Sequence, residues 1–109
     1  MPASDASVVI DVVNGRIVCD PATSVYHGRR ATWSRAANAT FSFRLRFTPK
    51  SGSSPWPFTG PKPADNWTDM KPSFSGVIAA KEDDAFKYDV EVDIAGVNSY
   101  DPMIIVGRG

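Results

Sequence analysis

The chain has 109 residues, of which 42% are hydrophobic and 22% charged, and its twelve basic and twelve acidic residues cancel. These values predict one globular domain, residues 1–109, and exclude a chain too polar to fold. The zero net charge gives no general attraction to nucleic acid or to an anionic membrane, and no stretch approaches the roughly 20 apolar residues of a spanning helix.

The first part of the chain predicts a β-hairpin. Residues 8–13 are almost all β-branched, and the Asn14-Gly15 dipeptide that follows favours a type I′ turn. The expected return strand, 16–19, stops before Pro21, which lacks an N–H for a ladder. Pro21 therefore marks an edge of a sheet or an exit from it.

Two later stretches alternate between apolar and polar residues and are predicted as half-buried antiparallel strands. In 39–47, three phenylalanines and a leucine face one way, and in 86–94 aromatic and β-branched residues do the same. A helix would scatter these side chains around its circumference. Further short strands are expected at 30–34, which carries Trp33, at 74–79 and at 103–106.

The polar faces of the two alternating stretches carry opposite charges. Arg44 and Arg46 lie on the first, and Asp89, Glu91 and Asp93 on the second. If these faces meet, cross-strand ion pairs follow, each contributing at most ~1 kcal/mol. The acidic stripe is alternatively a docking site.

Two segments resemble the cupredoxin family. The segment FKYDV at 86–90, followed by a turn and a closing strand at 103–106, resembles the family's aromatic-x-aromatic-x-Cys strand, ligand loop and last strand. The segment RATW at 30–33 is similar to the strand before the family's first histidine ligand. The family's cysteine falls at Val90 and that histidine at about Phe41, so the resemblance implies the sandwich without copper or electron transfer.

The expected fold is therefore an all-β, Greek-key β-sandwich of about seven strands, either cupredoxin-like or immunoglobulin-like. Several short strands with turn signals between them are typical of this class, and nowhere do apolar residues recur at helical spacing over three turns.

The stretch from 48 to 72 breaks the strand pattern. It holds six of the nine prolines together with Trp56, Phe58 and Trp67. A loop this long in a compact domain is functional, disordered or a misinterpreted strand region. Trp56 stands between two prolines and is expected outside any ladder. Since exposed indoles contact sugars and protein side chains, Trp56, Phe58 and Trp67 are the candidate binding residues. The alternative is that they close one end of the sandwich.

Other candidate sites are weaker. His27 has no carboxylate near it in sequence, and Cys19, the single cysteine, follows two apolar residues as a small buried side chain would. The acidic run 81–84 lacks the ligand spacing and the glycine of a calcium loop and is expected to be a solvated turn. A single cysteine also excludes an internal disulfide and a multi-cysteine zinc site.

These observations predict a non-enzymatic protein-binding or self-assembly module that uses the 48–72 loop or an exposed sheet edge. The alternative is a small-ligand or carbohydrate binder at Trp56 and Trp67. No catalytic residue, metal, cofactor, nucleic acid or membrane partner is expected. The first residues lack the basic and apolar regions of a signal peptide, which predicts a cytoplasmic protein, although a chain with its signal peptide removed would look the same.

Overall fold

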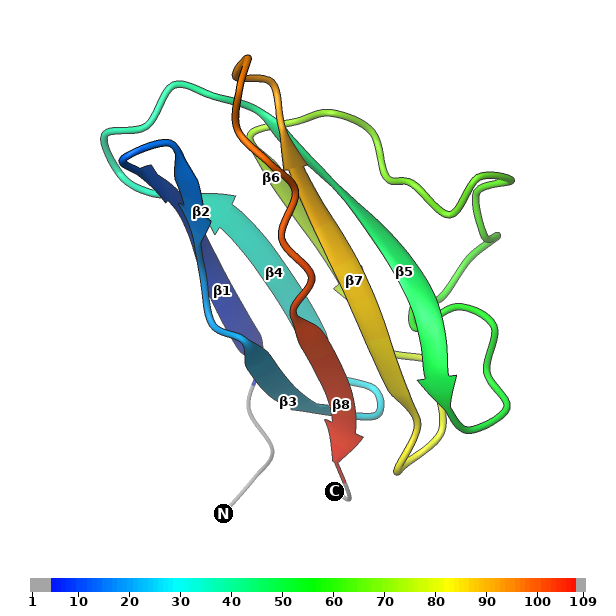
Figure 1. Cartoon of the computed structure of the whole chain (residues 1–109). Coiled ribbons are helices and arrows are strands. Elements are labelled where there is room, and N and C mark those ends of the chain that lie inside the picture. Colours follow the sequence, from blue (N-terminus) through cyan, green and yellow to red (C-terminus); the bar gives the residue numbers. More distant parts are fainter. Residues whose placement is uncertain (1–4, 108–109) are drawn as a thin grey trace.

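The computed structural model describes residues 5–107 and shows two stacked β-sheets, with no helix in that range (Figure 1). The strands are β1 (Ala6–Val13), β2 (Arg16–Val18), β3 (Ala22–Tyr26), β4 (Arg30–Arg35), β5 (Phe43–Ser51), β6 (Ser73–Val77), β7 (Ala85–Val92) and β8 (Met103–Gly107). The all-β sandwich expected from the sequence is confirmed. Accordingly, no helix within 5–107 has the length and apolar character needed to cross a membrane.

The first sheet has the strand order β2-β1-β4-β6 and the second β3-β8-β7-β5. The pairs β1–β4 and β3–β8 are parallel, and the other pairs are antiparallel. Strands β5 and β6 are thus edge strands of different sheets. The connection between them, residues 52–72, extends beyond β5 on the right-hand side of Figure 1.

The predicted hairpin is present between β1 and β2. Asn14 and Gly15 have φ angles of 53° and 76°, which is the positive-φ pair that a type I′ turn requires. Val13 and Arg16 are directly paired across the turn.

The core lies between the sheets and confirms the predicted alternation within β5 and β7. The predicted end of the second stretch at 94 is wrong, because β7 ends at Val92 and Ile94 is 39% exposed. Phe43, Leu45 and Phe47 of β5 are at most 1% exposed, and Tyr88 and Val90 of β7 are fully buried. These side chains pack against buried residues of the first sheet, which include Val8, Ile10 and Trp33. Apolar burial on both inner faces is the main source of stability in such a sandwich.

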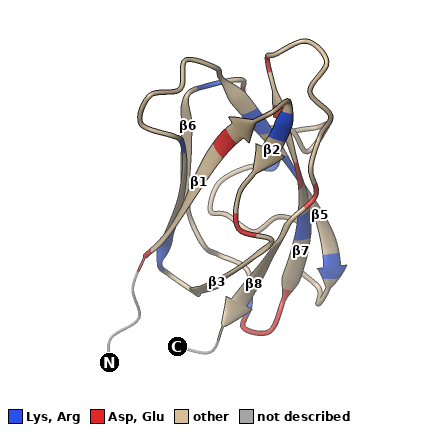
Figure 2. Cartoon of the chain, turned by 60° about the vertical axis from the view of Figure 1, so that its left-hand side comes forward, with Lys and Arg blue, Asp and Glu red and all other residues tan. Residues whose placement is uncertain are grey.

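The predicted ion pairs between β5 and β7 are also present. Arg44 is in register with Glu91 and Arg46 with Asp89, and the closest N–O distance is 2.7 Å in both pairs. Lysine, arginine, aspartate and glutamate occur on strands and connections of both sheets (Figure 2), as expected for a chain without net charge.

Eight strands are present instead of the expected seven or so, because β3 was not predicted from the sequence. In β3 only Val25 is buried, so the local pattern carries little signal. The strand forms because it pairs in parallel with β8, a partner from the other end of the chain. Pro21 directly precedes this edge strand, as an edge marker should.

The predicted bounds of the long loop and of the strand before it are wrong. β5 begins at Phe43 instead of at 39 and continues to Ser51, so residues 48–51 belong to the strand. Pro49 is tolerated because β5 is an edge strand, and the register shifts between Pro49 and Ser51. The connection proper is therefore 52–72.

The acidic run 81–84 is only partly the solvated turn that was expected. Asp84 is 4% exposed and accepts hydrogen bonds from the hydroxyl and the backbone N–H of Ser54. A carboxylate is buried here because the connection 52–72 brings donors to it, which the local sequence does not reveal.

Candidate functional site

The connection 52–72 begins as a short extension of the first sheet. Phe58 forms a bridge with Ile78, and the Thr59 N–H donates to the Val77 carbonyl at 2.9 Å. The Ala79 N–H donates to the Pro57 carbonyl at the same distance. Residues 57–59 thus lie antiparallel to the end of β6, on the edge opposite β4.

The second part of the connection covers the edge of the second sheet. The Thr68 N–H donates to the Leu45 carbonyl at 2.8 Å, and Lys71 and Phe43 exchange two backbone hydrogen bonds of 2.9 Å. The Thr68 hydroxyl also accepts a hydrogen bond from the Leu45 N–H at 3.0 Å. Because 67–71 pairs with the backbone of Phe43 and Leu45, this part of the β5 edge is not available to another strand.

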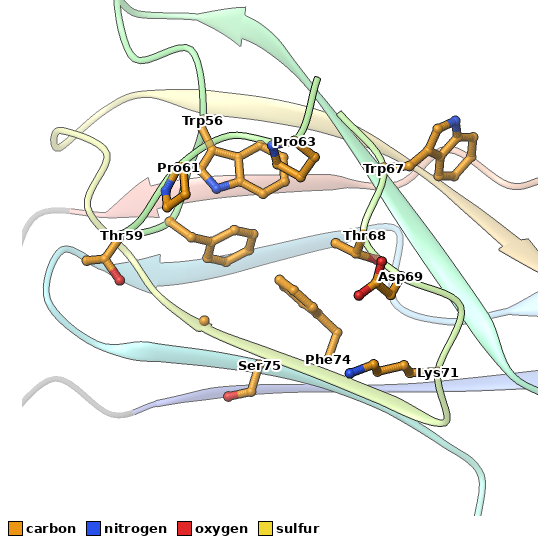
Figure 3. Close-up of a pocket in the computed structure, with 12 residues that line it drawn as sticks. Trp56, Thr59, Pro61, Pro63, Trp67, Thr68, Asp69, Lys71, Phe74 and Ser75 are labelled. Atoms are coloured by element: carbon orange, nitrogen blue, oxygen red, sulfur yellow. The ribbon is translucent and has the colours of Figure 1, made fainter. Parts of the chain in front are cut away.

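A cleft of about 370 Å³ lies between the connection and β6 (Figure 3). Its walls combine aromatic rings and prolines with a few polar groups. The lining residues are Trp56, Phe58, Thr59, Pro61, Pro63, Trp67, Thr68, Asp69, Lys71, Phe74, Ser75 and Gly76. A larger hollow of about 460 Å³ lies beside residues 36–41 and Ile94, but Phe41 is its only aromatic residue. We therefore take the first as the candidate site.

The floor of the cleft depends on a glycine in β6. Phe58 is 5% exposed, and its ring lies against Gly76, where an added Cβ would be 2.6 Å from Phe58 Cδ1. The ring contacts Trp33, Phe47 and Phe74 with centroid distances of 5.9, 5.0 and 5.2 Å. The cleft is thus built directly on the aromatic core.

Trp56 both closes the core and lines the cleft. Its indole is half-buried and lies edge-to-face against Phe47 at 5.5 Å and Phe58 at 5.6 Å. It lies outside the strands, as predicted from its flanking prolines. Trp56 therefore packs against the core, as a residue that closes the sandwich would, and contact of its cleft side with a ligand stays a prediction.

The Trp67 indole lies apart from that of Trp56 (Figure 3). Its indole points away from the other labelled side chains in Figure 3 and lies against Arg44 and Arg46 on the outer face of β5. The guanidinium carbons are 4.2 and 4.9 Å from the ring centroid, within the range of cation–π contacts. The structure brings Trp56 and Phe58 together and places the Trp67 indole on a separate surface.

Two charged side chains at the cleft have no ion-pair partner within 5–107. Asp69 and Lys71 are both exposed and lie on the same stretch of the connection. Their charges are opposite, so the cleft carries little net charge. Such a site favours an uncharged or apolar group.

The other candidate residues lie elsewhere. Burial, and secondarily the charge of Asp20, raises the pKa of the Cys19 thiol to about 11, so the reactive thiolate is scarce at neutral pH. The exposed ring of His27 places Nδ1 2.9 Å from the Ala80 carbonyl oxygen. Within residues 5–107, no three His, Cys, Asp or Glu side chains gather in a way that could hold a metal ion.

Phe74 and Gly76 are parts of the site that were not predicted from the sequence. Both fall in the strand predicted at 74–79, where their spacing indicated a face of the sheet and nothing more. No sequence signal shows that β6 is an edge strand beside the long connection, because this depends on the pairing of distant strands.

Comparisons of the chain with protein-family models, with curated proteins and with solved structures found no match.

Proposed function

We propose that this protein is a non-enzymatic protein-binding module that receives an apolar side chain of its partner in the cleft between the connection 52–72 and β6. The observation that carries the proposal is the aromatic wall formed by Trp56, Phe58 and Phe74. The volume of about 370 Å³ is within the roughly 300–1,000 Å³ of common ligand pockets. Aromatic pockets of this kind commonly hold the residues that dominate binding energy at protein interfaces.

The polar groups of the cleft support binding over catalysis. The Thr68 hydroxyl is engaged by the backbone of Leu45, and it is not paired with a base. Asp69 and Lys71 form no hydrogen bond with a nucleophilic side chain within the described residues. Nucleophilic catalysis needs a nucleophile and a base within hydrogen-bond distance.

A sugar-like ligand is the second candidate, and Trp56 favours it. An indole beside the hydroxyl of Thr59 and the carboxylate of Asp69 offers one stacking surface and two hydrogen-bonding groups. The carbohydrate site predicted from the sequence also included Trp67, but we leave it out here because its ring lies against Arg44 and Arg46.

The experiment is a set of ¹H–¹⁵N titrations with small probes of each ligand class. N-acetyl-leucine methylamide and N-acetyl-tryptophan methylamide represent protein side chains, and chitotriose and cellotriose represent sugars. We expect the amino-acid probes to shift the backbone amides of Phe58, Phe74 and Gly76. The Trp56→Ala variant should lose these shifts, and the matched Trp67→Ala variant should keep them.

Each result decides between the candidates. Shifts with the sugars alone would replace the protein-binding proposal with the carbohydrate one. If no probe moves the cleft amides, the cleft does not bind ligands of either class. Light scattering on the same samples tests self-assembly, since an oligomer that Trp56→Ala dissociates would identify a second copy as the partner.

A further inference from the structure

Strand β6 leaves part of its outer edge without backbone partners. The Arg35 N–H donates to the Pro72 carbonyl and the Ile78 N–H to the Arg29 carbonyl, so even-numbered residues of this segment bond toward β4. In an antiparallel ladder the intervening residues point their N–H and C=O groups the other way. The Val77 carbonyl accepts a hydrogen bond from the Thr59 N–H. Within 5–107, the N–H and C=O groups of Ser73 and Ser75, which point away from β4, have no partner.

The chain itself stops covering this edge at Gly60 and Pro61. Continuing the antiparallel register of Phe58 with Ile78 would place residue 61 opposite Ser75. Pro61 has no N–H to donate, and Gly60, with a φ of +91°, turns the chain away before that position. Residues 57–59 therefore begin an added strand and leave the rest of the edge open.

The open edge lies beside the aromatic cleft. Phe74 and Gly76, the neighbours of Ser75 in β6, both line the cleft. Side chains of an added strand would alternate in the same way. The residue paired with Ser75 would face outward, and the residues before and after it would face the cleft.

Arg30 places an exposed positive charge beside Ser75, on the face of the first sheet that points away from the core. Arg30 Nη1 donates to Ser75 Oγ at 3.0 Å, and Thr32 Oγ1 lies 3.2 Å from the same oxygen. The guanidinium of Arg30 is exposed and forms no ion pair within the described residues. An acidic side chain opposite Ser75 would accept a charge-assisted hydrogen bond from it.

We infer that the edge of β6 at Ser73 and Ser75 binds an extended segment of another protein as an added antiparallel strand, with the local sequence apolar–acidic–apolar. This inference rests on the proposed function and names its ligand. The two apolar side chains enter the cleft, the acidic one meets Arg30, and backbone hydrogen bonds to Ser73 and Ser75 hold the segment.

A second copy of the chain fits this edge less well. Pairing two β6 edges about a two-fold axis at Ser75 would bring the two Arg30 side chains together on one face of the joined sheet. Like charges brought close together repel each other. The positive charge therefore favours an acidic partner segment over self-pairing.

The test uses fluorescein-labelled peptides and anisotropy at low salt. The probe is GSTLELTSG, acetylated and amidated, and its control carries lysine in place of glutamate. We expect the lysine peptide to bind at least tenfold more weakly. Arg30→Gln should weaken the glutamate peptide by a similar factor, and Arg29→Gln, a matched change at the preceding exposed arginine, should change its affinity less than twofold.

The backbone hydrogen bonds are tested on the peptide, so that the protein fold is unchanged. A methyl group on the glutamate nitrogen removes the N–H that would donate to the Ser75 carbonyl, and we expect at least a tenfold loss. A methyl group on the nitrogen of the following leucine, which would point away from β6, should cost less than threefold.

The two proposals fail in different ways. Suppose that Trp56→Ala abolishes peptide binding, whereas N-methylation and Arg30→Gln do not affect it. This result would keep the cleft as the binding site and overturn strand addition. Absence of binding by either peptide would also overturn this inference, and the amino-acid probes above would still decide the proposed function. A dimer in solution with hydrogen-exchange protection of the Ser73 and Ser75 amides would show that a second copy occupies the edge.

Discussion

The carboxylate of Asp84 is buried in an otherwise exposed acidic run, and one backbone conformation in the connection makes this possible. Gly52 has a φ of +92°, and a Cβ there would overlap Asp84 Oδ1 and lie 3.1 Å from Asp84 Cα. With glycine at this position, Ser54 can approach and donate to the carboxylate.

Gly52→Ala should therefore destabilise the protein more than Gly60→Ala. The two glycines have nearly the same φ, +92° and +91°, but nothing lies within 4 Å of a Cβ at Gly60. Both variants bear the cost of positive φ, about 1–2 kcal/mol, and the collision with Asp84 should add at least ~1 kcal/mol for Gly52→Ala. Urea unfolding measures the difference, and equal losses would mean that Asp84 moves aside freely.

Cys19 should make the free energy of unfolding decrease at alkaline pH. The fold raises the pKa of its thiol from 9.0 to about 11, mainly through burial. A raised pKa means that the folded state favours the protonated thiol. The resulting stabilisation is complete below pH 9 and is lost as the pH rises toward about 11.

We expect Cys19→Ala to lose less stability than the wild type between pH 9 and 11. Some loss will remain, because burial also raises the pKa of Tyr88 well above its usual value. Urea unfolding across this range measures both proteins. Identical pH profiles would show that ionisation of Cys19 is not linked to folding.

Among the elements, β7 shows most directly how the period of a strand separates core from surface. Val90 is fully buried, whereas the next residue, Glu91, leaves 39% of its side chain exposed beside Arg44. Val90→Asp would place an unpaired carboxylate in the core and should abolish cooperative folding. Glu91→Ala removes a partly exposed ion pair and should cost no more than ~0.5 kcal/mol. Circular dichroism during urea titration tests both, and a reversed order would mean that the strand faces the other way.

The connection 52–72 acts as an element of its own, because part of its aromatic content belongs to the core. Trp33 is fully buried, and Trp33→Ala should cost about 3–5 kcal/mol. Trp56 has edge-to-face contacts with Phe47 and Phe58, so Trp56→Ala should cost about 1–3 kcal/mol, at ~0.5–1.5 kcal/mol for each aromatic pair. Urea unfolding ranks the two variants. A loss for Trp56→Ala as large as that for Trp33→Ala would make Trp56 chiefly a core residue.

At the scale of the whole molecule, the resemblance to cupredoxins makes a prediction about copper. The positions that this resemblance would assign to the family's cysteine and first histidine hold Val90, fully buried, and Phe41, 7% exposed. The chain has one cysteine and one histidine, whereas a blue copper site needs a thiolate and two imidazoles. Adding Cu(II) should therefore produce no intense thiolate-to-copper absorption band. A stoichiometric blue species would overturn the assignment of these two positions.

The whole molecule also explains why the candidate site lies on one side of the sandwich. β5 and β6 end their respective sheets, and the connection 52–72 pairs with both of them. It covers β5 over 67–71 but leaves β6 after residue 59, which creates a cleft and an open strand edge next to each other. The proposed binding mode follows from this unequal covering.

The sequence by itself determined the parts of this protein that depend on local periodicity and turn chemistry. Alternation identified β5 and β7, their inward faces and their ion pairs, because side chains of a strand alternate whatever its neighbours are. Asn14-Gly15 identified the first hairpin, since those residues readily adopt positive φ. The long proline-rich stretch singled out Trp56 and Phe58, whose rings are in contact at the cleft.

Tertiary structure alone decided which edges meet and what they expose. The partner of β3 comes from the other end of the chain, so its pairing left no local signal. Trp56 and Trp67 lie in the same stretch, yet the strand pairing of Arg46 with Trp67 turns the second indole to the outer face of the sheet. The edge at Ser75 is open because the chain turns away at Gly60, before Pro61 could fall opposite Ser75 in the register of Phe58 with Ile78. Each of these depends on contacts between residues far apart in sequence, which periodicity does not encode.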